Sequence, residues 1–387
     1  GFRKGQLVIV SGPPKHGKCL GKGTKILMFD GTVKKIENIK VEESIMGPDS
    51  LPRKVLSLSR GKEMMYKVIQ RGENYIVNES HILSLQRNNG HLWRTDNVKK
   101  EKQPRRKKEG EIININVKDY LNKSTTFKHH HKGYKVAANF SFSPIDLDPY
   151  FLGLWLGDGS SNNTSITTMD KEIKEYLFQY ALSLKLRVTP QKQKNNAATT
   201  YFLVNKKNQK NILRELLKKH KIFCNKHIPH LFKVNSAEIR LAVLAGIIDT
   251  DGYLTATNDY DIIQKSNKLS EDIAFLARSL GFAVTKRKCF KGIKNRNFKG
   301  IYNRLRISGD IAKIPVKIPR KKSYCVPFKN VLRTSIRLQK LNIDNYYGFE
   351  LDGDGLFLLG DFTVTHNTSL CQTFTKTFAE KHRCLWF

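Results

Sequence analysis

Two short stretches, one near each end of the sequence, carry residues whose types and spacing could do chemistry. Near the start, Gly12, Gly17 and Lys18 follow a short apolar stretch with the spacing G-x-x-x-x-G-K. This spacing is typical of a P-loop, in which backbone amides and the lysine bind phosphate. The next position of a P-loop is a Ser or Thr that binds Mg²⁺, but here it is Cys19, and a thiol is a poor ligand for a hard cation. The loop is therefore chemically incomplete.

The missing hydroxyl residue stands near the other end of the sequence. Thr368 begins an amphipathic pattern that predicts a helix. Joining Lys18 directly to Thr368 gives G-P-P-K-H-G-K-T-S between a predicted strand and a predicted helix, which is the setting that a P-loop needs. We predict that the 349 residues 19–367 interrupt this P-loop. Only the joined host protein would bind ATP and Mg²⁺, through Gly12, Gly17, Lys18 and Thr368.

The residues at the two junctions have the side chains that rearrangement of a peptide bond requires. Cys19 can attack the carbonyl carbon of Lys18 and convert that amide to a thioester, because a thiolate is a strong nucleophile and a good leaving group. The Thr368 hydroxyl can then attack the thioester and form a branched ester. Asn367 can cyclise onto its own carbonyl and break the bond to Thr368, with His366 beside it as acid or base. An acyl shift from oxygen to nitrogen would leave an ordinary peptide bond between the flanks.

Three motifs in this segment resemble those of the inteins, in particular the vacuolar-ATPase type. Residues 19–32 (CLGKGTKILMFDGT) resemble the N-terminal motif, residues 72–81 (GENYIVNESH) an internal motif, and residues 345–367 the C-terminal motifs. Gly355 stands where many inteins carry a His, and Glu350 stands where an Asp is common. The resemblance implies protein splicing that needs no cofactor.

The resemblance also implies roles for residues of the internal motif. His81 would protonate the nitrogen that leaves when Cys19 attacks, and Asn78 and Ser80 would assist it. The catalytic residues of splicing would then be His81 and Asn78 together with the junction residues Cys19, His366, Asn367 and Thr368.

Short strands must position these residues. Alternating apolar stretches such as Lys25–Phe29 and Asp361–Thr365 are typical of strands in a compact all-β module, which would cover roughly residues 19–90 and 340–367. The chemistry requires such a module, because residues from both ends of the segment must meet. The resemblance implies that it is an all-β Hedgehog/intein (HINT) splicing domain.

The middle of the sequence contains an internal repeat. Residues 151–159 are similar to residues 244–252, and residues 166–189 align without gaps with residues 262–285, which lie 96 positions later. Each copy predicts an apolar helix that ends in Asp-Gly, followed by strands and an amphipathic helix.

Two carboxylates would end the paired apolar helices. Small residues would let the helices pack backbone to backbone, and glycines would end them: Gly153, Gly157, Ala245, Gly246, Gly159 and Gly252. Asp158 and Asp251 would then lie close together, and two close carboxylates repel each other unless a divalent cation lies between them. Such a site suits the hydrolysis of two phosphodiesters, one in each strand of a duplex. The alternative is a pair of buried carboxylates that only cap helices.

The repeat resembles the LAGLIDADG homing endonucleases. The resemblance implies an α+β domain with pseudo-two-fold symmetry, which uses Mg²⁺ held by Asp158 and Asp251 and binds double-stranded DNA with its sheets. Lys226, in K-H-I-P, resembles a catalytic lysine of this family, and Lys322, in R-K-K-S, resembles the second. The fold class is therefore predicted to be mixed, an all-β splicing domain plus an α+β endonuclease.

The composition favours a nucleic-acid partner. The formal net charge is +35, and residues 286–322 contain 14 Lys or Arg and one acid. Aromatic and β-branched residues interleave with these charges, which predicts a folded basic surface. A hydrophobic share of 39% excludes a disordered chain, and the absence of a long apolar run excludes a spanning helix. The six scattered cysteines indicate neither a disulfide framework nor a zinc ribbon, so we expect a reduced cytoplasmic setting.

We predict a bifunctional monomer that splices itself and cuts DNA at the uninterrupted gene. Its predicted parts are a flank (1–18), the splicing domain (19–145 and 326–367) with a possible DNA-recognition insertion (91–135), the endonuclease (146–325) and a second flank (368–387). The flanks resemble the RecA-like core of a replicative helicase. Two alternatives stay open: a splicing element whose nuclease is inactive, and a DNA-binding P-loop ATPase whose insertion stays in place.

Overall fold

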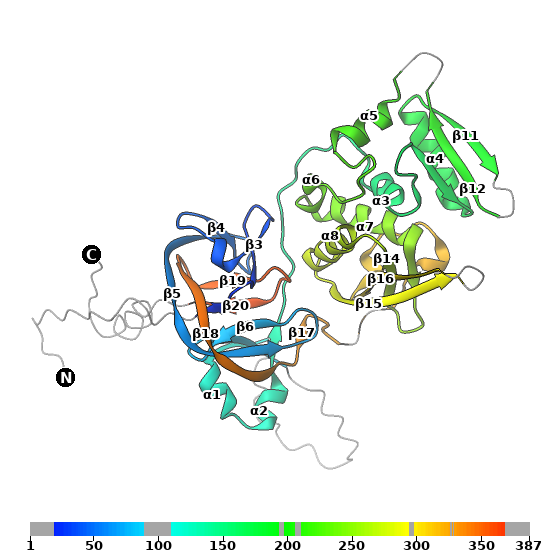
Figure 1. The fold of residues 1–387 in the computed structure, drawn as a ribbon. Helices are drawn as coiled ribbons and strands as arrows, with labels where there is room; N and C mark the ends of the chain where they lie inside the picture. Colours follow the sequence, from blue (N-terminus) through cyan, green and yellow to red (C-terminus); the bar gives the residue numbers. More distant parts are fainter. Residues whose placement is uncertain are drawn as a thin grey trace, which may run out of the picture. The chain divides into compact units, whose positions relative to one another are not determined.

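The computed structural model describes residues 19–88, 110–192, 197–205, 210–293, 298–325, 327 and 329–367. Several predicted features lie outside the described residues: both flanks, the P-loop residues Gly12, Gly17 and Lys18, the junction residue Thr368, and the basic run 99–108 of the predicted insertion. The chain divides into unit 1, residues 1–134 with 334–387, and unit 2, residues 135–333 (Figure 1). Each unit has its own hydrophobic core. The domain boundaries drawn from the sequence stay a prediction.

Unit 1 consists mainly of antiparallel strands. The elements are β1 (Leu20–Gly21), β2 (Lys25–Leu27), β3 (Val33–Lys35), η1 (Ile36–Asn38), β4 (Ser44–Met46), β5 (Pro52–Ile69), β6 (Tyr75–Asn78), β7 (Ile82–Arg87), β8 (Ile112–Asn116), α1 (Val117–Leu121), α2 (Thr125–His130), β9 (His131–Tyr134), β17 (Arg333–Thr334), β18 (Arg337–Leu351), β19 (Leu356–Leu358) and β20 (Val364–His366). The part of the predicted insertion that the structure describes contains β8, α1, α2 and β9.

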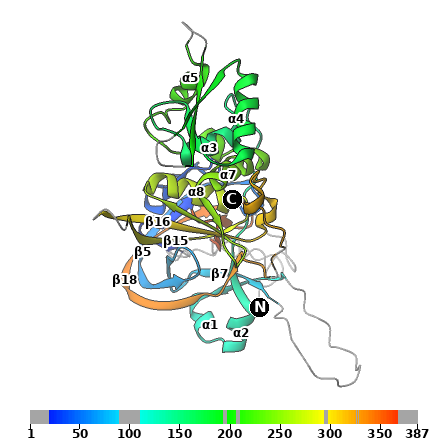
Figure 2. The ribbon, with the colours of Figure 1, turned by 90° about the vertical axis from the view of Figure 1, so that its right-hand side faces the viewer.

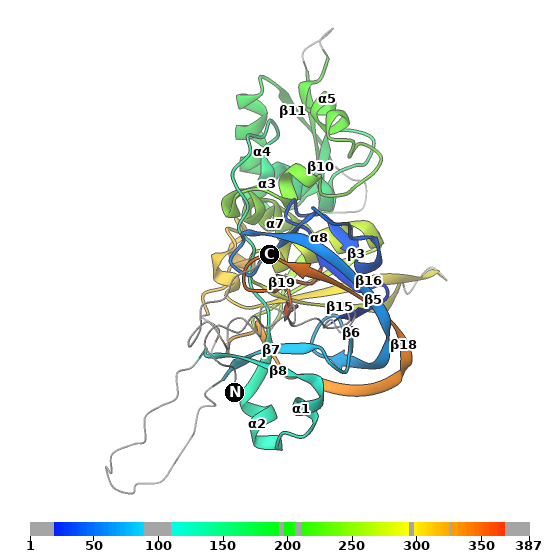
Figure 3. The same ribbon diagram turned by 90° about the vertical axis from the view of Figure 1, so that its left-hand side faces the viewer.

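Two long strands form the frame of unit 1. β5 and β18 pair with each other along most of their lengths and curve together, as Figure 3 shows. The pairing shifts register between Lys340 and Ile343 and again between Glu350 and Leu351, and such bulges let paired strands bend. β5 and β18 enclose the short strands β1 and β6 in a sheet of order β18-β1-β6-β5-β4. This sheet therefore brings the first residues of the segment against its last long strand.

Unit 2 contains the predicted repeat. The elements are α3 (Pro149–Asp158), β10 (Ser165–Thr168), α4 (Lys171–Ser183), β11 (Arg187–Lys192), β12 (Thr199–Val204), α5 (Ile212–Lys219), α6 (His230–Lys233), α7 (Ala237–Asp251), β13 (Gly252–Leu254), β14 (Tyr260–Gln264), α8 (Asn267–Ser279), β15 (Ala283–Ile293), β16 (Phe298–Ser308), η2 (Ile311–Lys313) and η3 (Pro319–Lys321).

The two halves of unit 2 have matching orders of elements. Each begins with an apolar helix, α3 or α7, and continues through one strand (β10) or two (β13 and β14) and an amphipathic helix, α4 or α8, to a two-stranded hairpin, β11–β12 or β15–β16. Figure 2 shows α3, α4, α7 and α8. Helix α8 begins and ends 96 residues after α4, which is the offset of the sequence repeat. The helices α3 and α7 pack against each other in the core, so the repeat is structural as well as sequential. Among the described residues, every helix is too short or too polar to cross a membrane.

Candidate functional site

Cys19 and Asn78 hold each other through two hydrogen bonds. The Cys19 backbone N–H donates to Asn78 Oδ1 at 2.8 Å, and the Asn78 backbone N–H donates to the Cys19 carbonyl at 3.1 Å. Cys19 directly precedes β1, and Asn78 ends the neighbouring strand β6. Both side chains are buried. The sheet thus places the predicted nucleophile beside the residue that was predicted to assist His81.

Glu63 fixes the side chain of Asn78, and no sequence motif singles this glutamate out. Its Oε2 accepts from Asn78 Nδ2 at 2.6 Å, and its Oε1 accepts from the backbone N–H and the hydroxyl of Ser80, at 3.1 Å and 2.7 Å. Because Asn78 donates to Glu63, its amide oxygen must face the Cys19 N–H. Ser80 therefore contacts Glu63, and it supports this turn rather than Cys19 itself. Sequence could have found Glu63 only through the register that sets Met65 of β5 opposite Asn78.

The surroundings of the Cys19 thiol oppose its ionisation. Burial raises the pKa of Cys19 to about 12, the hydrogen bond with Ser59 lowers it, and the charge of Glu63 raises it. The Sγ atom lies 3.4 Å from the Ser59 hydroxyl oxygen. On the other side is Gly348, where a Cβ would lie closer than 3.0 Å to Sγ. The thiol therefore rests in its protonated form.

We expect this high pKa to appear in the pH dependence of the first step. In a chain carrying Asn367→Ala, the rate of cleavage between Lys18 and Cys19 by hydroxylamine should rise about tenfold per pH unit from about pH 7 to about pH 9, because only the thiolate attacks. The cleaved fraction is measured by electrophoresis over time. A rate that levels off near neutral pH would contradict a thiol of raised pKa.

Asn367 contacts the same strand as Cys19. The Asn367 side-chain amide donates to the Phe349 carbonyl, and its backbone N–H donates to the Gly355 carbonyl at 2.7 Å. Phe349 follows Gly348, the residue that touches the Cys19 thiol. The two predicted junction residues, at opposite ends of the segment, thus lie against adjacent residues of β18.

His366 and Asn367 are both buried, and the turn that contains Gly355 packs against them. His366 pairs with Leu356 in the hairpin of β19 and β20, which lies inside unit 1 (Figure 1). Gly355 has a positive φ of +74°, and a Cβ there would lie closer than 3.0 Å to the Asn367 carbonyl oxygen. A histidine cannot occupy this position without displacing the carbonyl that Asn367 must attack. This backbone accounts for glycine at a position where many inteins have His.

Gly355→Ala and Gly355→His should both slow cleavage after Asn367. The added Cβ displaces the Asn367 carbonyl, so in a Cys19→Ala background we expect release of the C-terminal flank to fall by at least about tenfold. Gly353→Ala is the matched control, because its φ of +73° imposes the same strain while its Cβ would meet only Arg53, at 3.5 Å. Equal slowing by Gly353→Ala would attribute the effect to strain alone, and faster release in Gly355→His would contradict the steric account.

His81, the third predicted residue of this centre, is fully buried one turn beyond Asn78. Its backbone N–H donates to the Asn78 carbonyl at 3.1 Å, and its ring Nε2 lies 2.8 Å from the Thr365 hydroxyl. Unit 1 thus gathers Cys19, Asn78, His81 and Asn367. Glu350, the second departure from the intein pattern, accepts from the Ser57 hydroxyl at 3.1 Å.

The two acids of the repeat end the paired helices of unit 2. Asp158 is the last residue of α3, and Asp251 is the last residue of α7. Gly153 and Gly246 lie at the crossing of these helices, where a Cβ on either would lie closer than 3.0 Å to a backbone carbonyl oxygen of the other helix. The helices can therefore approach only with glycine at both positions. Helices α3 and α7 thus pack backbone to backbone, as the sequence predicted.

Burial raises the pKa values of both acids. Burial is the larger cause for each, and for Asp251 the charge of Asp158 adds to it, which brings the pKa to about 6. Two acids that disfavour each other's ionisation fit a divalent cation, which would relieve the repulsion. Among the described residues there is no cluster of three or more His, Cys, Asp or Glu side chains, so further ligands would be backbone carbonyls, water or a phosphate.

Two lysines cap the ends of these helices, and one of them is not the lysine that the sequence indicated. Lys226 Nζ donates to the carbonyls of Leu156, Gly157 and Gly159 at 2.6–3.1 Å. At the end of α7 the equivalent donor is Lys321, whose Nζ reaches three carbonyls at 2.8–3.1 Å. Burial lowers the pKa of both lysines, that of Lys226 to about 8.

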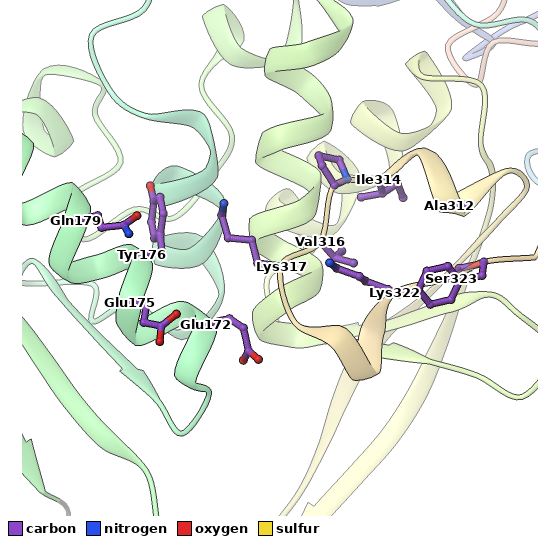
Figure 4. A pocket seen from close by; sticks show the side chains of 12 residues that line it. Glu172, Glu175, Tyr176, Gln179, Ala312, Ile314, Val316, Lys317, Lys322 and Ser323 are labelled. Carbon is purple, nitrogen blue, oxygen red and sulfur yellow. The ribbon is translucent and has the colours of Figure 1, made fainter.

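Lys322 therefore does not occupy the position that the sequence assigned to it. Its side chain is exposed and lines a surface pocket with Glu172 and Tyr176 of α4, as Figure 4 shows. The short helix η3 ends at Lys321 and directs that residue inward, so Lys322 points away from α7. Lys321, rather than Lys322, thus occupies the position at α7 that Lys226 occupies at α3, and we propose it as the second lysine.

The predicted basic surface is the hairpin β15–β16. Its exposed side chains include Arg287, Lys288 and Lys291, and Phe290 between them is 77% exposed. Ile307 on the same hairpin is buried in the core. Arg287 and Lys291 lie on the face opposite to Ile307, and Lys288 is exposed on the Ile307 face further along the strand. The hairpin thus presents cations to solvent, as a sheet that contacts a polyanion would.

Three family models match successive parts of the chain. The model described as Hom_end-associated Hint matches residues 19–147, the model described as Homing endonuclease matches residues 145–225, and the model described as LAGLIDADG-like domain matches residues 238–314. The chain therefore belongs to the inteins that carry an embedded homing endonuclease. This confirms the class and the mixed fold that the sequence predicted.

The curated relatives are much longer proteins of which this chain spans a small part. It is 50% identical over 52 residues to a catalytic subunit of the V-type proton ATPase from Candida tropicalis, which is 13% of this chain and 5% of that protein. It is 29% identical over 151 residues to the replicative DNA helicase DnaB of Mycobacterium intracellulare, which is 39% of this chain and 22% of that protein.

Solved structures with similarity to the chain include a homing endonuclease and an intein. Mesophilic variants of the homing endonuclease I-DmoI are 18% identical, with a TM-score of 0.28, over 42% of this chain and 87% of theirs. The gp41-1 intein is 26% identical, with a TM-score of 0.16, over 17% of this chain and 52% of its own.

Proposed function

We propose that the chain splices out residues Cys19–Asn367 and joins Lys18 to Thr368. The observation that carries this proposal is the contact of Cys19 and Asn367 with adjacent residues of β18. Two reactive residues from opposite ends of the segment have no structural reason to converge on one strand, whereas splicing requires it.

The first step uses the Cys19 thiol. Its sulfur attacks the Lys18 carbonyl carbon, the bond to the Cys19 nitrogen breaks, and His81 gives that nitrogen a proton. The Asn78 amide, held by Glu63, orients the nitrogen through its hydrogen bond at 2.8 Å. A thioester to Lys18 results.

The later steps use Thr368 and Asn367. The Thr368 hydroxyl attacks the thioester, and the Cys19 sulfur leaves as a thiol. The Asn367 side-chain nitrogen then attacks the backbone carbonyl carbon of Asn367. The bond to Thr368 breaks, and the Thr368 nitrogen leaves with a proton that His366 donates. The freed amine displaces the ester oxygen, which restores the Thr368 hydroxyl and forms the new peptide bond.

We further propose that unit 2 cleaves both strands of a DNA duplex with a divalent cation such as Mg²⁺. Asp158 and Asp251 would hold the cation, which when bound would neutralise charge that develops on the phosphodiester. Lys226 and Lys321 would stabilise the same charge. I-DmoI has been solved in complex with its target DNA in the presence of Mn or Mg, which supports the proposal. We propose a cytoplasmic location and a monomeric state from the sequence alone.

A plasmid assay tests the nuclease. A supercoiled plasmid that carries the joined P-loop codons should become linear with Mg²⁺, and a plasmid whose codons are interrupted by this segment should stay supercoiled. No linear product from the first plasmid, with splicing intact, would favour the alternative of an inactive nuclease. The proposed helicase identity of the flanks is tested separately, by the sequence of the complete host gene.

A further inference from the structure

The hydroxyl of Thr365 contacts the ring of His81, and the proposed steps give Thr365 no role. Thr365 lies in β20, and both residues are 0% exposed. The Thr365 Oγ1 atom lies 2.8 Å from His81 Nε2, which is a normal hydrogen-bond distance. The two residues are 284 positions apart in sequence, so the contact joins the internal motif to the C-terminal motif.

The direction of this hydrogen bond depends on which nitrogen of the His81 ring carries the hydrogen. A buried hydroxyl hydrogen needs an acceptor. Among the residues that the structure describes, the Thr365 hydroxyl has a hydrogen bond with His81 Nε2. If Nε2 carried the ring hydrogen, the hydroxyl could accept it but would leave its own hydrogen buried and unbonded. We take the hydroxyl as the donor, so that Nε2 accepts and the hydrogen of the neutral ring lies on Nδ1.

We propose that Thr365 is a positioning residue for the first splicing step, because it holds His81 in the tautomer whose Nδ1 carries a proton. This rests on the proposed function, in which His81 gives a proton to the nitrogen of Cys19. The two hydrogen bonds between Asn78 and Cys19 bring the His81 turn to that nitrogen. Without the Thr365 hydroxyl, the ring could turn or change tautomer, and the proton would no longer be held for the leaving nitrogen.

The contact also connects the two ends of the reaction. Thr365 stands two residues before Asn367, and β20 positions both. A displacement of β20 would therefore disturb the donor of the first step and the nucleophile of the cyclisation together.

The test measures the first step alone, in chains that all carry Asn367→Ala. The rate of thiol-induced cleavage between Lys18 and Cys19 is measured for this parent chain and for two variants of it, which also carry Thr365→Val or Thr365→Ser. Valine has the shape of threonine without the hydroxyl. We expect cleavage at least about tenfold slower, because a positioned acid usually accelerates a reaction by more than that. Serine keeps the hydroxyl, and we expect a rate within about threefold of the parent.

Thr363→Val is the matched control. Thr363 is equally buried, stands two residues earlier on the same side of the extended chain, and accepts from Gln70 Nε2 at 2.9 Å. Its loss should cost stability without slowing cleavage by more than about twofold. Equal slowing by Thr363→Val and Thr365→Val would show a general packing effect and overturn the proposal.

Nitrogen chemical shifts of the His81 ring give a readout that packing alone would not move. We expect the Nδ1–H tautomer in the parent and in Thr365→Ser. The Nε2–H tautomer in the parent would overturn the proposal even if Thr365→Val failed to fold. A parent that does not cleave at all would overturn the proposed splicing function instead, whereas a cleaving parent with an unaffected Thr365→Val would overturn only the role of Thr365.

Discussion

A chain that carries both Cys19→Ala and Asn367→Ala should remain intact at its full 387 residues. Cys19→Ala removes the sulfur that attacks the Lys18 carbonyl, and Asn367→Ala removes the amide that cleaves the second junction. We expect each bond to break at least about a thousandfold more slowly than in the unaltered chain, because loss of a covalent nucleophile leaves no alternative route. The products are separated and weighed after expression.

The single variants separate the two junctions. Cys19→Ala alone should still release the C-terminal flank through Asn367, and Asn367→Ala alone should release the N-terminal flank when a thiol is added. Cys224→Ala is the control, since Cys224 is an exposed cysteine of unit 2. Ligated flanks in the double variant would contradict the roles of both residues.

Lys321→Met should nearly abolish DNA cleavage while Lys322→Met leaves it within about threefold of the unaltered chain. Lys321 is buried, with its Nζ at the end of α7, and its charge acts on the pKa of Asp158. Lys322 is exposed in the pocket of Figure 4. We expect about a hundredfold loss for Lys321→Met, and at least a similar loss for Asp158→Asn or Asp251→Asn. Cleavage of a labelled duplex is followed over time.

Binding to the same duplex without divalent cations separates lost chemistry from a lost fold. The Lys321→Met chain should still bind, because we expect the exposed cations of β15 and β16 to carry most of the affinity. An active Lys321→Met together with an inactive Lys322→Met would contradict the correction made from the structure.

The parts that sequence could predict are those where chemistry restricts the residue type. A cysteine at one junction and an asparagine at the other are readable because few side chains perform those steps. The helices α3 and α7 were predictable because only glycine permits their close approach at Gly153 and Gly246.

The parts that sequence missed depend on direction and register. Lys321 and Lys322 are adjacent and chemically identical, so only the turn of η3 decides which of them points inward. Glu63 contacts Asn78, and Thr365 contacts His81 from 284 positions away in the sequence, and neither contact follows from residue spacing alone. Gly159 and Gly252 do end the helices, but with extended backbone rather than a left-handed turn. Glycine is required at both positions because neighbouring carbonyls leave no room for a Cβ.

The masses of the products of the expressed chain test the central claim most directly. We expect two species, an excised segment of the 349 residues 19–367 and a joined peptide of the two flanks in which Lys18 is bonded to Thr368. Fragmentation of the joined peptide should give the order G-K-T-S across the new bond. A single unprocessed chain of 387 residues, persisting with Cys19 and Asn367 both unaltered and the protein folded, would contradict splicing.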